Sequence, residues 1–441
     1  MEVDKLIDRT LAKHRESGIL LHRPYPPLGL PSVRSRLGGL PTLPEGIEWP
    51  YGRSPYDRKA VPLHFLAQID CAELPPIDAR MPEEGMLFFF ARDDEEQVWG
   101  YGGAPHDDGR VIYARGVADD QGVRTPPAGL LPIRDRGVGF DPVLPKKAGP
   151  SVHLSWPLIA MEFDTWPDSS TLARPLGYAY DDRLERLRTA SFSVATGLSP
   201  DSLNPSPEWQ KDLLPNRPFR LPTFAPVGIA IQCISYEIIA EVLKRKADAT
   251  LPEARQIMTD ARRWIDRAHV IGLDKIAPAK EIANFEAWLK TLAELNDRDR
   301  EPPPLVDRQA RQQWFNEWPL ASKLRCAMPQ IFAQALTDSI AFLAGSPASA
   351  ALVPAEAYDS MERRFSPLAR PKLRTHQMLG HAPATQEAMG VDSDLICLLQ
   401  LVSEEALGMT FGDAGEVAFW ISGDDLTRGR FDNAKIRLQG H

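Results

Sequence analysis

The sequence predicts an α+β fold: a β-rich body made of two related halves, interrupted by an inserted helical subdomain. The regions 19–165 and 372–441 contain short runs of aromatic and β-branched residues bounded by Pro and Gly, a pattern typical of strands. Between them, apolar residues recur at helical spacing. Motifs of the first strand-rich region reappear in the same order in the second, which indicates an internal duplication.

These patterns divide the chain into five segments. We expect an N-terminal helix at 1–18, an N-terminal β-rich half at 19–165, a Pro-rich connection at 166–225 with one helix near 180–190, a helical insertion at 226–371, and a C-terminal β-rich half at 372–441 that packs with the first. Gly18 is expected to end the first helix. Within the insertion, Ile257, Ala261 and Ile265 predict an amphipathic helix that buries one face.

Three pairs of motifs carry the duplication. LGGLP at 37–41 matches LGHAP at 379–383, HFLAQID at 64–70 matches ICLLQLV at 396–402, and EEGMLFFFARDD at 83–94 matches DAGEVAFWISGD at 413–424. Each half thus places one glutamine, Gln68 or Gln400, in an apolar strand, where a buried amide needs hydrogen-bond partners. Two interpretations follow: each amide bonds to a loop of the other half, or the two amides face a ligand site near a pseudo-twofold axis.

Candidate ligand- or partner-binding residues lie in and beside these motifs. Asp70 ends the strand of Gln68, and Asp413 precedes Gly415 in a tight turn. Two such acids can perform general acid–base chemistry in a cleft, whereas Asp in turns usually bonds to its own backbone. An arginine beside two glycines fits an anion cradle or a tight turn. The complete candidate set is Arg36, Gly38, Gly39, Gln68, Asp70, Gln400, Asp413 and Gly415.

Composition excludes several classes of function. The formal net charge is −9, which disfavours a nucleic-acid partner because phosphate binding depends on clustered Lys and Arg. The four cysteines and nine histidines are scattered, so neither a metal site, a cofactor nor a disulfide framework is predicted. The sequence has no secretory signal and no apolar run of about 18 residues, so we expect a cytoplasmic protein without a membrane span.

The motifs resemble the YwqG-like family. Its N-terminal signature is similar to Arg36-Leu-Gly-Gly-Leu-Pro41, Trp49-Pro50 and Pro62 to Asp70, and its C-terminal signature is similar to Leu398-Leu-Gln400, Phe411 to Gly415 and Phe419 to Ile421. The family is mostly bacterial and of unknown function. The resemblance therefore implies a β-rich α+β fold of two related halves, with no assigned chemistry or cofactor. Members encoded near toxin genes imply toxin immunity as one role.

Two functions are compatible with these observations. The first is a non-catalytic binding protein that recognises a basic protein partner, such as a nuclease toxin, because the chain is acidic. The alternative is a small-ligand-binding protein or hydrolytic enzyme that uses a polar cleft between the two β-rich halves. Acidic side chains gathered on an outer face favour the first function, and polar side chains that converge in a deep pocket favour the second. No oligomeric state is predicted.

Overall fold

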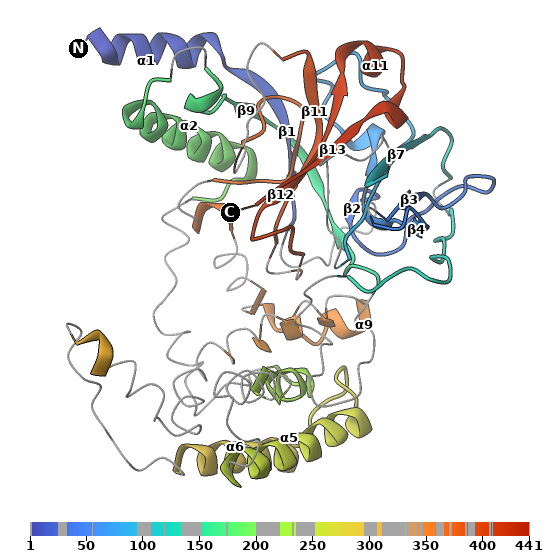
Figure 1. Ribbon diagram of the computed structural model, residues 1–441, viewed down its shortest axis with the longest axis vertical. Coiled ribbons are helices and arrows are strands. Elements are labelled where there is room, and N and C mark those ends of the chain that lie inside the picture. Colours follow the sequence, from blue (N-terminus) through green and yellow to red (C-terminus); the bar gives the residue numbers. More distant parts are fainter. Residues whose placement is uncertain are drawn as a thin grey trace. The chain divides into compact units, whose positions relative to one another are not determined.

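The computed structural model divides into two compact units (Figure 1). The first unit comprises 1–136, 150–204 and 358–441, and the second comprises 137–149 and 205–357. The structure describes residues 2–24, 33–54, 56–94, 107–118, 120–133, 151–172, 175–199, 221–231, 233–234, 252–294, 307–310, 331, 335–336, 338–340, 342–343, 347–355, 357–358, 366–369, 373–383, 386, 393–404, 407 and 409–440.

The first unit contains two larger antiparallel sheets and a two-stranded ribbon. Sheet A consists, in order across the sheet, of β9 (Ile159–Thr165), β1 (Glu16–His22), β10 (Gln377–Met378), β11 (Leu395–Val402), β12 (Glu416–Ser422) and β13 (Lys435–Gln439). Sheet B consists of β8 (Trp156–Pro157), β2 (Arg36–Leu37), β5 (His64–Asp70), β6 (Met86–Ala91) and β7 (Gly109–Ala114). The ribbon pairs β3 (Tyr51–Arg53) with β4 (Ala60–Pro62).

The two sheets repeat one arrangement of strands, which confirms the predicted duplication. The first half, β8-β2-β5-β6-β7, has the same order as the second half, β1-β10-β11-β12-β13. The pairing register also repeats, because Gln68 lies opposite Phe88 and Gln400 lies opposite Ala418. Each half even has a register shift just before its glutamine, between Phe65 and Ala67 in β5 and between Cys397 and Leu399 in β11.

Backbone hydrogen bonds outside the strands match as well. In the first half, Leu158 N–H donates to Ser35 O and Cys71 N–H donates to Gly85 O. The equivalent bonds of the second half run from Leu21 N–H to His376 O and from Ser403 N–H to Gly415 O. Together with the registers, these bonds define which residues of the two halves correspond. Hydrogen-bond registers identify equivalent residues more reliably than similarity of short sequence motifs does. A register error of one residue would turn every side chain to the other face of its strand, so registers leave no room for such an error.

The second half takes one strand from the beginning of the chain. β1 pairs with β10 inside sheet A, at the place that β8 occupies beside β2 in sheet B. The expected N-terminal half of 19–165 therefore does not form one sheet, since β1 and β9 both belong to sheet A. The N-terminal helix α1 (Glu2–Lys13) ends before Gly18, which was expected to end it. Gly18 instead lies within β1. A Cβ atom at Gly18 would lie 2.8 Å from Thr165 Cγ2, so close strand packing explains this glycine.

The sheets meet at a pair of corresponding residues. The ring centroids of Phe89 in β6 and Phe419 in β12 lie 5.2 Å apart in an edge-to-face arrangement. Contact between two corresponding residues marks a twofold axis, in this case a pseudo-twofold axis within one chain. The edge strands β7 and β13 also contact one another near this axis, with Gly109 against Ile436.

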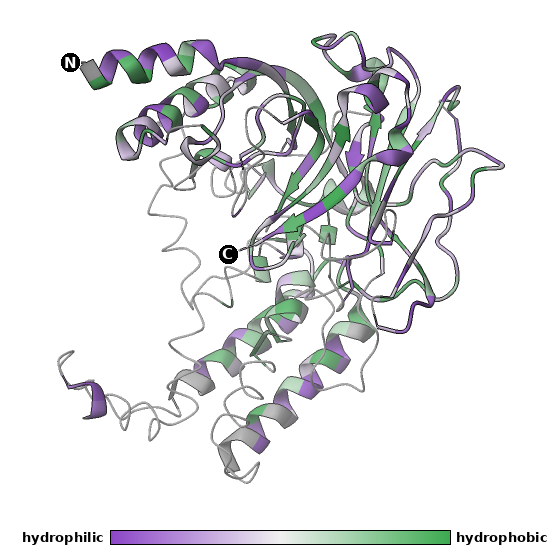
Figure 2. Cartoon of the chain, turned by 45° about the horizontal axis from the view of Figure 1, so that its top comes forward, coloured by the Kyte–Doolittle hydropathy of each residue, from purple (hydrophilic) through white to green (hydrophobic). Residues whose placement is uncertain are grey.

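Two helices cover one side of sheet A in Figure 1. α2 (Tyr178–Thr196) packs on the edge strand β9, where Ser191 Oγ accepts a hydrogen bond from Asp164 N–H and donates to Asp164 O. These bonds occupy part of an edge that is otherwise free to pair with another strand. α1 packs on α2 through Ile7 and Leu11, and Figure 2 shows its alternation of hydrophilic and hydrophobic residues.

The second unit is helical in its described residues. It contains α5 (Pro252–Ile271), α6 (Ala279–Glu294) and the short α9 (Pro347–Ala350). The predicted apolar face of α5 is buried, and Trp264 stacks edge-on against Phe285 of α6 with centroids 5.1 Å apart. Residues 201–220 and 235–250, which belong to the expected connection and insertion, lie outside the described residues.

The two glutamines bond within their own halves rather than to each other or to the opposite half. Gln68 Oε1 accepts from the N–H and Oγ1 of Thr42 at 3.1 and 3.2 Å, and its Nε2 donates to Arg34 O. Gln400 Nε2 donates to Pro383 O at 2.5 Å. Proline has no N–H, so among the described residues Gln400 Oε1 has no hydrogen-bond donor.

These contacts correct the expected alignment of the two loops by one residue. Thr42 and Pro383 correspond, whereas the motif letters pair Pro41 with Pro383. The left-handed residues agree with the contacts, because Gly38 and Gly39 have φ of 55° and 73°, and Leu379 and Gly380 have φ of 57° and 60°. The first left-handed position thus holds glycine in one half and a strained leucine in the other.

The unequal bonding predicts unequal effects of the same substitution. Gln68→Leu leaves Thr42 N–H and Arg34 O without their partner and should lower the free energy of unfolding by about 1–3 kcal/mol. Gln400→Leu removes an oxygen that is already unpaired and only one hydrogen bond, to Pro383 O, and should cost about 1 kcal/mol or less. Urea unfolding followed by circular dichroism measures both variants, and equal losses would contradict the assignment of these bonds.

Candidate functional site

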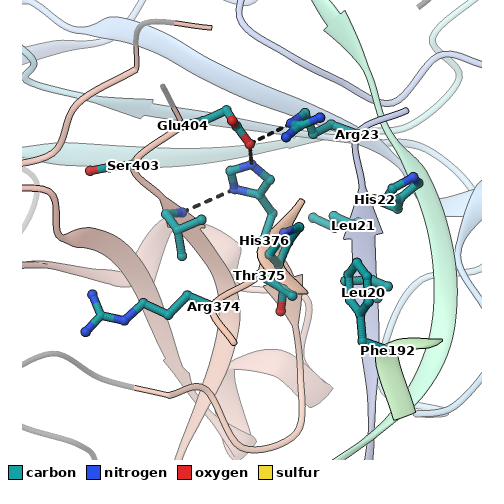
Figure 3. A pocket seen from close by; sticks show the side chains of 12 residues that line it. Leu20, Leu21, His22, Arg23, Phe192, Arg374, Thr375, His376, Ser403 and Glu404 are labelled. Carbon is teal, nitrogen blue, oxygen red and sulfur yellow. Dashed lines mark hydrogen bonds and ion pairs between the residues drawn. The ribbon is translucent and has the colours of Figure 1, made fainter. Parts of the chain in front are cut away.

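A cluster of buried charged side chains lies in the second half, beside β1 (Figure 3). Arg23 Nε donates to Glu404 Oε2 at 2.6 Å, and His376 Nε2 lies 3.8 Å from the same oxygen. All three residues are buried. His376 Nδ1 accepts a hydrogen bond from Val402 N–H, so the neutral ring carries its proton on Nε2, toward Glu404.

Electrostatics hold this Arg23 cluster in a charged state. Burial alone raises the pKa of Glu404, but Arg23 and His376 outweigh it and lower that pKa to about 2. Nearby, burial lowers the pKa of His22 to about 4, helped by the charge of Arg23, so His22 is neutral at pH 7. The cluster therefore contains a carboxylate and a guanidinium in direct contact away from water.

The corresponding positions of the first half hold small residues. Arg23, His376 and Glu404 correspond to Ala160, Ser35 and Ala72. Ser35 Oγ accepts a hydrogen bond from Asp70 N–H, just as His376 Nδ1 accepts from Val402 N–H. The cavity beside the cluster measures only about 20 Å³, enough for about one water molecule. We interpret the Arg23 cluster as a tie between β1 and the rest of the second half.

A second, larger concavity forms the candidate binding site and is named the groove. Its volume is about 640 Å³, within the range of small-molecule sites. One wall is the loop Ile77–Arg80, which follows the 3-10 helix Cys71–Glu73 of the first half. The remaining lining residues come from β1, the segment after β9, and β10 to β12: Glu16, Ser17, Pro167, Asp168, Thr171, Leu379, Gly380, His381, Ala382, Ser393, Asp394, Leu395, Ile396, Trp420 and Gly423.

Charged side chains dominate the rim of the groove. Arg80 binds Asp78 through Nε and Nη2, which lowers the pKa of that carboxyl. His381 Nε2 lies 3.4 Å from Glu16 Oε1, and its hydrogen bond is the main cause that lowers the pKa of Glu16. Asp168 pairs with a residue of α2, Arg188, at 2.9 Å. With Asp394, four carboxylates line the groove against one arginine, so it is negative at neutral pH.

The residues nominated from the sequence lie elsewhere. Arg36 and Gln68 lie opposite one another on β2 and β5, but the whole set does not gather in one place. None of them lines the groove. Asp70 pairs with Arg34 at 3.1 Å and caps the following 3-10 turn through Ala72 N–H. Arg36 Nη2 donates to Leu40 O, and burial lowers the pKa of Arg36 to about 10.

The nominated glycines and Asp413 belong to turns. Gly38 packs against the backbone of Leu154, since a Cβ there would clash with Leu154 O, and Gly39 packs on the side chain of Ser155. Asp413 is exposed at the tip of its turn. Gly415 is required by close approach, because a Cβ would clash with Gln439 O.

The groove residues carried no signal in the sequence. They are scattered over more than half of the chain as single acids, a histidine and an arginine, and share no motif spacing. Within the described part of the chain, no group of three or more His, Cys, Asp or Glu side chains is placed to hold a metal ion. No described helix combines the length and apolarity that crossing a membrane requires.

Comparison with known proteins identifies one family. A family model described as a domain of unknown function (DUF1963) matches residues 35–196 and 274–439, which together make up more than half of the chain. Its two matched regions agree with the duplicated architecture. The interval between them, 197–273, is shorter than the helical insertion expected at 226–371. A search of curated proteins found no match.

The Arg23 cluster predicts a pH-dependent stability. Because the pKa of Glu404 is lowered on folding, its carboxylate contributes fully to the free energy of unfolding above about pH 4.5. That contribution is lost as the pH falls toward 2. Glu404→Gln leaves Arg23 buried without its counter-charge and should lower the free energy of unfolding at pH 7 by about 3 kcal/mol.

Melting temperatures of the wild type and Glu404→Gln, measured from pH 7 to pH 2.5, check this prediction. The difference between the two proteins should shrink below pH 4.5. The exposed Glu45→Gln is the matched control, with no difference expected at any pH. A difference that stays constant down to pH 2.5 would contradict the ion pair.

Proposed function

The chain belongs to the family of the domain of unknown function DUF1963, and we propose that it binds a small polar ligand in the groove. The single observation that carries this proposal is the groove itself. It has the volume of a ligand site, and polar side chains from both halves converge on it. The proposal includes binding and no assigned reaction. The finer resemblance to the YwqG-like family is part of the same proposal.

Two further features support a ligand site at this place. Leu379, on the groove wall, has a left-handed φ of 57°, a conformation that costs a leucine about 1–3 kcal/mol and is often kept for function. The groove also combines an apolar part, formed by Leu395, Ile396 and Trp420, with a charged rim. Such a combination binds the body of a ligand and orients its polar groups.

A glycine on the groove wall allows the site to be blocked without a change of charge. A Cβ at Gly423 would meet only the flexible end of Arg80 at 3.3 Å and Ile396 Cδ1 at 3.9 Å, so a larger side chain can be accommodated there. Gly423→Phe should fill the groove and preserve the fold. Gly122→Phe is the matched control, because Gly122 is exposed and no atom lies within 4 Å of its Cβ position.

The test is a ligand-observed NMR screen of a mixed set of small amines, carboxylic acids, alcohols and sugars. We expect at least one compound to bind the wild type and Gly122→Phe but not Gly423→Phe. Melting curves verify that both variants are folded. If no compound shows binding that Gly423→Phe removes, the proposed function is wrong.

A second proposal is a basic protein partner, with toxin immunity as one form of this role. The observation that favours it is the net charge of −9, which promotes association with a positive surface. Affinity purification from the source cells at low and high salt tests it. A basic protein that is released by about 0.5 M salt is expected, since exposed charges are screened at that ionic strength. Recovery of only neutral or acidic proteins would contradict it.

A further inference from the structure

The duplication relates the groove to a closed region of the first half. Counting from the matched hydrogen bonds without a gap, Glu16 corresponds to His153, since Leu21 corresponds to Leu158. Along the matched β6 and β12, Gly423 corresponds to Asp93. Along β5 and β11, Ile396 corresponds to His64. Three residues that line the groove thus have counterparts that are gathered in the first half.

In the first half, this position is filled by the protein's own His153–Asp93 pair. His153 Nε2 lies 2.8 Å from Asp93 Oδ2, and both side chains are completely buried. His64 closes the same region, because its Nδ1 accepts from Asp93 N–H and its Nε2 lies 2.9 Å from Leu131 O. A nitrogen base and a carboxylate therefore satisfy one another where the second half has open space.

The second half retains neither member of this pair at its matched position, and a carboxylate replaces the ring of His153. Glu16 stands at the position of the His153 ring, and its side chain is 59% exposed. Gly423 leaves out the acid, and Ile396 replaces the second ring with an apolar side chain. These exchanges leave the place of the Asp93 side chain open, with the Glu16 carboxylate and His381 in the same lining.

We propose, on the basis of the ligand-binding function above, that the groove recognises a protonated amine whose N–H groups bind the Glu16 carboxylate. The uncharged part of the ligand then lies on the apolar part of the groove, formed by Leu395, Ile396 and Trp420. The ligand would thus make with the protein the same kind of nitrogen–carboxylate contact that His153 and Asp93 make with each other in the first half. A charge-assisted hydrogen bond of this kind is stronger than a neutral one.

The surrounding charges favour a cation over an anion. His381 faces Glu16 Oε1, and within the described residues Oε2 accepts no hydrogen bond, so it is open to a ligand. Arg80, the arginine of the groove, is held by the Asp78 carboxylate through its Nε and Nη2, which compensates its charge. A carboxylate ligand would meet Glu16 and Asp394 with like charge, whereas Asp168 is compensated by Arg188.

Three molecules of similar shape and different charge test the proposal at pH 7: benzylamine, benzyl alcohol and benzoate. Titrations followed by ligand-observed NMR or calorimetry measure their affinities. We expect benzylamine to bind about tenfold or more tightly than the alcohol, and benzoate to bind least. Glu16→Gln should abolish the preference for the amine, and Glu16→Asp should restore part of it. Glu286→Gln, an exposed exchange on α6, should change nothing.

The outcomes separate this inference from the proposed function. If benzyl alcohol or benzoate binds as well as the amine, and Gly423→Phe removes that binding, the groove is a ligand site and the inference of a cationic ligand is wrong. The same conclusion follows if amine binding is unaffected by Glu16→Gln. If Gly423→Phe changes the binding of no compound, both the inference and the proposed function fail.

Discussion

The contact between Phe89 and Phe419 is the constraint on which the rest of the β body depends. Each phenylalanine lies on the second strand from the edge of its sheet, at the same position of the repeat. They meet near the pseudo-twofold axis that relates the strands β8-β2-β5-β6-β7 of one half to β1-β10-β11-β12-β13 of the other. The edge strands β7 and β13 come into contact near the same axis. The duplicated register is therefore a property of the packing as well as of the sequence.

Against this shared framework, the differences between the halves become informative. A proline in place of Thr42 leaves the amide of Gln400 half satisfied. An arginine, a histidine and a glutamate in place of small residues tie β1 into sheet A. The loss of the His153–Asp93 pair opens the groove. Duplication supplies two similar scaffolds, and each half places its buried polar pairs at different positions of the shared framework.

The strands and their repetition were predictable from the sequence because alternating apolar runs and turn residues are local signals. Gln68 and Gln400 were correctly paired with one another, since both interrupt apolar strands and the next motif follows at similar intervals, 17 residues from Gln68 to Gly85 and 15 from Gln400 to Gly415. The pairing of β1 with β10 was not predictable. The two strands are far apart in the sequence, and antiparallel pairing between distant strands produces no pattern in either segment. The sequence alignment of the loops at 37–41 and 379–383 was wrong by one residue. The cause is that Leu379 has a left-handed backbone conformation, which a leucine in the sequence does not indicate. The groove was missed because its residues become neighbours only when both halves are folded.

The position of β1 has a consequence for synthesis of the chain. β1 lies between β9 and β10 inside sheet A, and its pairing with β10 joins Leu20 to Gln377. Arg23 and Glu404, which tie the same strand, are separated by 381 residues. On the ribosome β1 can pair with β9 early, but its other edge has no partner until β10 emerges, after the whole helical region has been synthesised. Such an apolar edge is open to wrong pairing during that interval. The chain should therefore depend on chaperones more than its first half alone, and slower translation of the helical region should prolong that dependence.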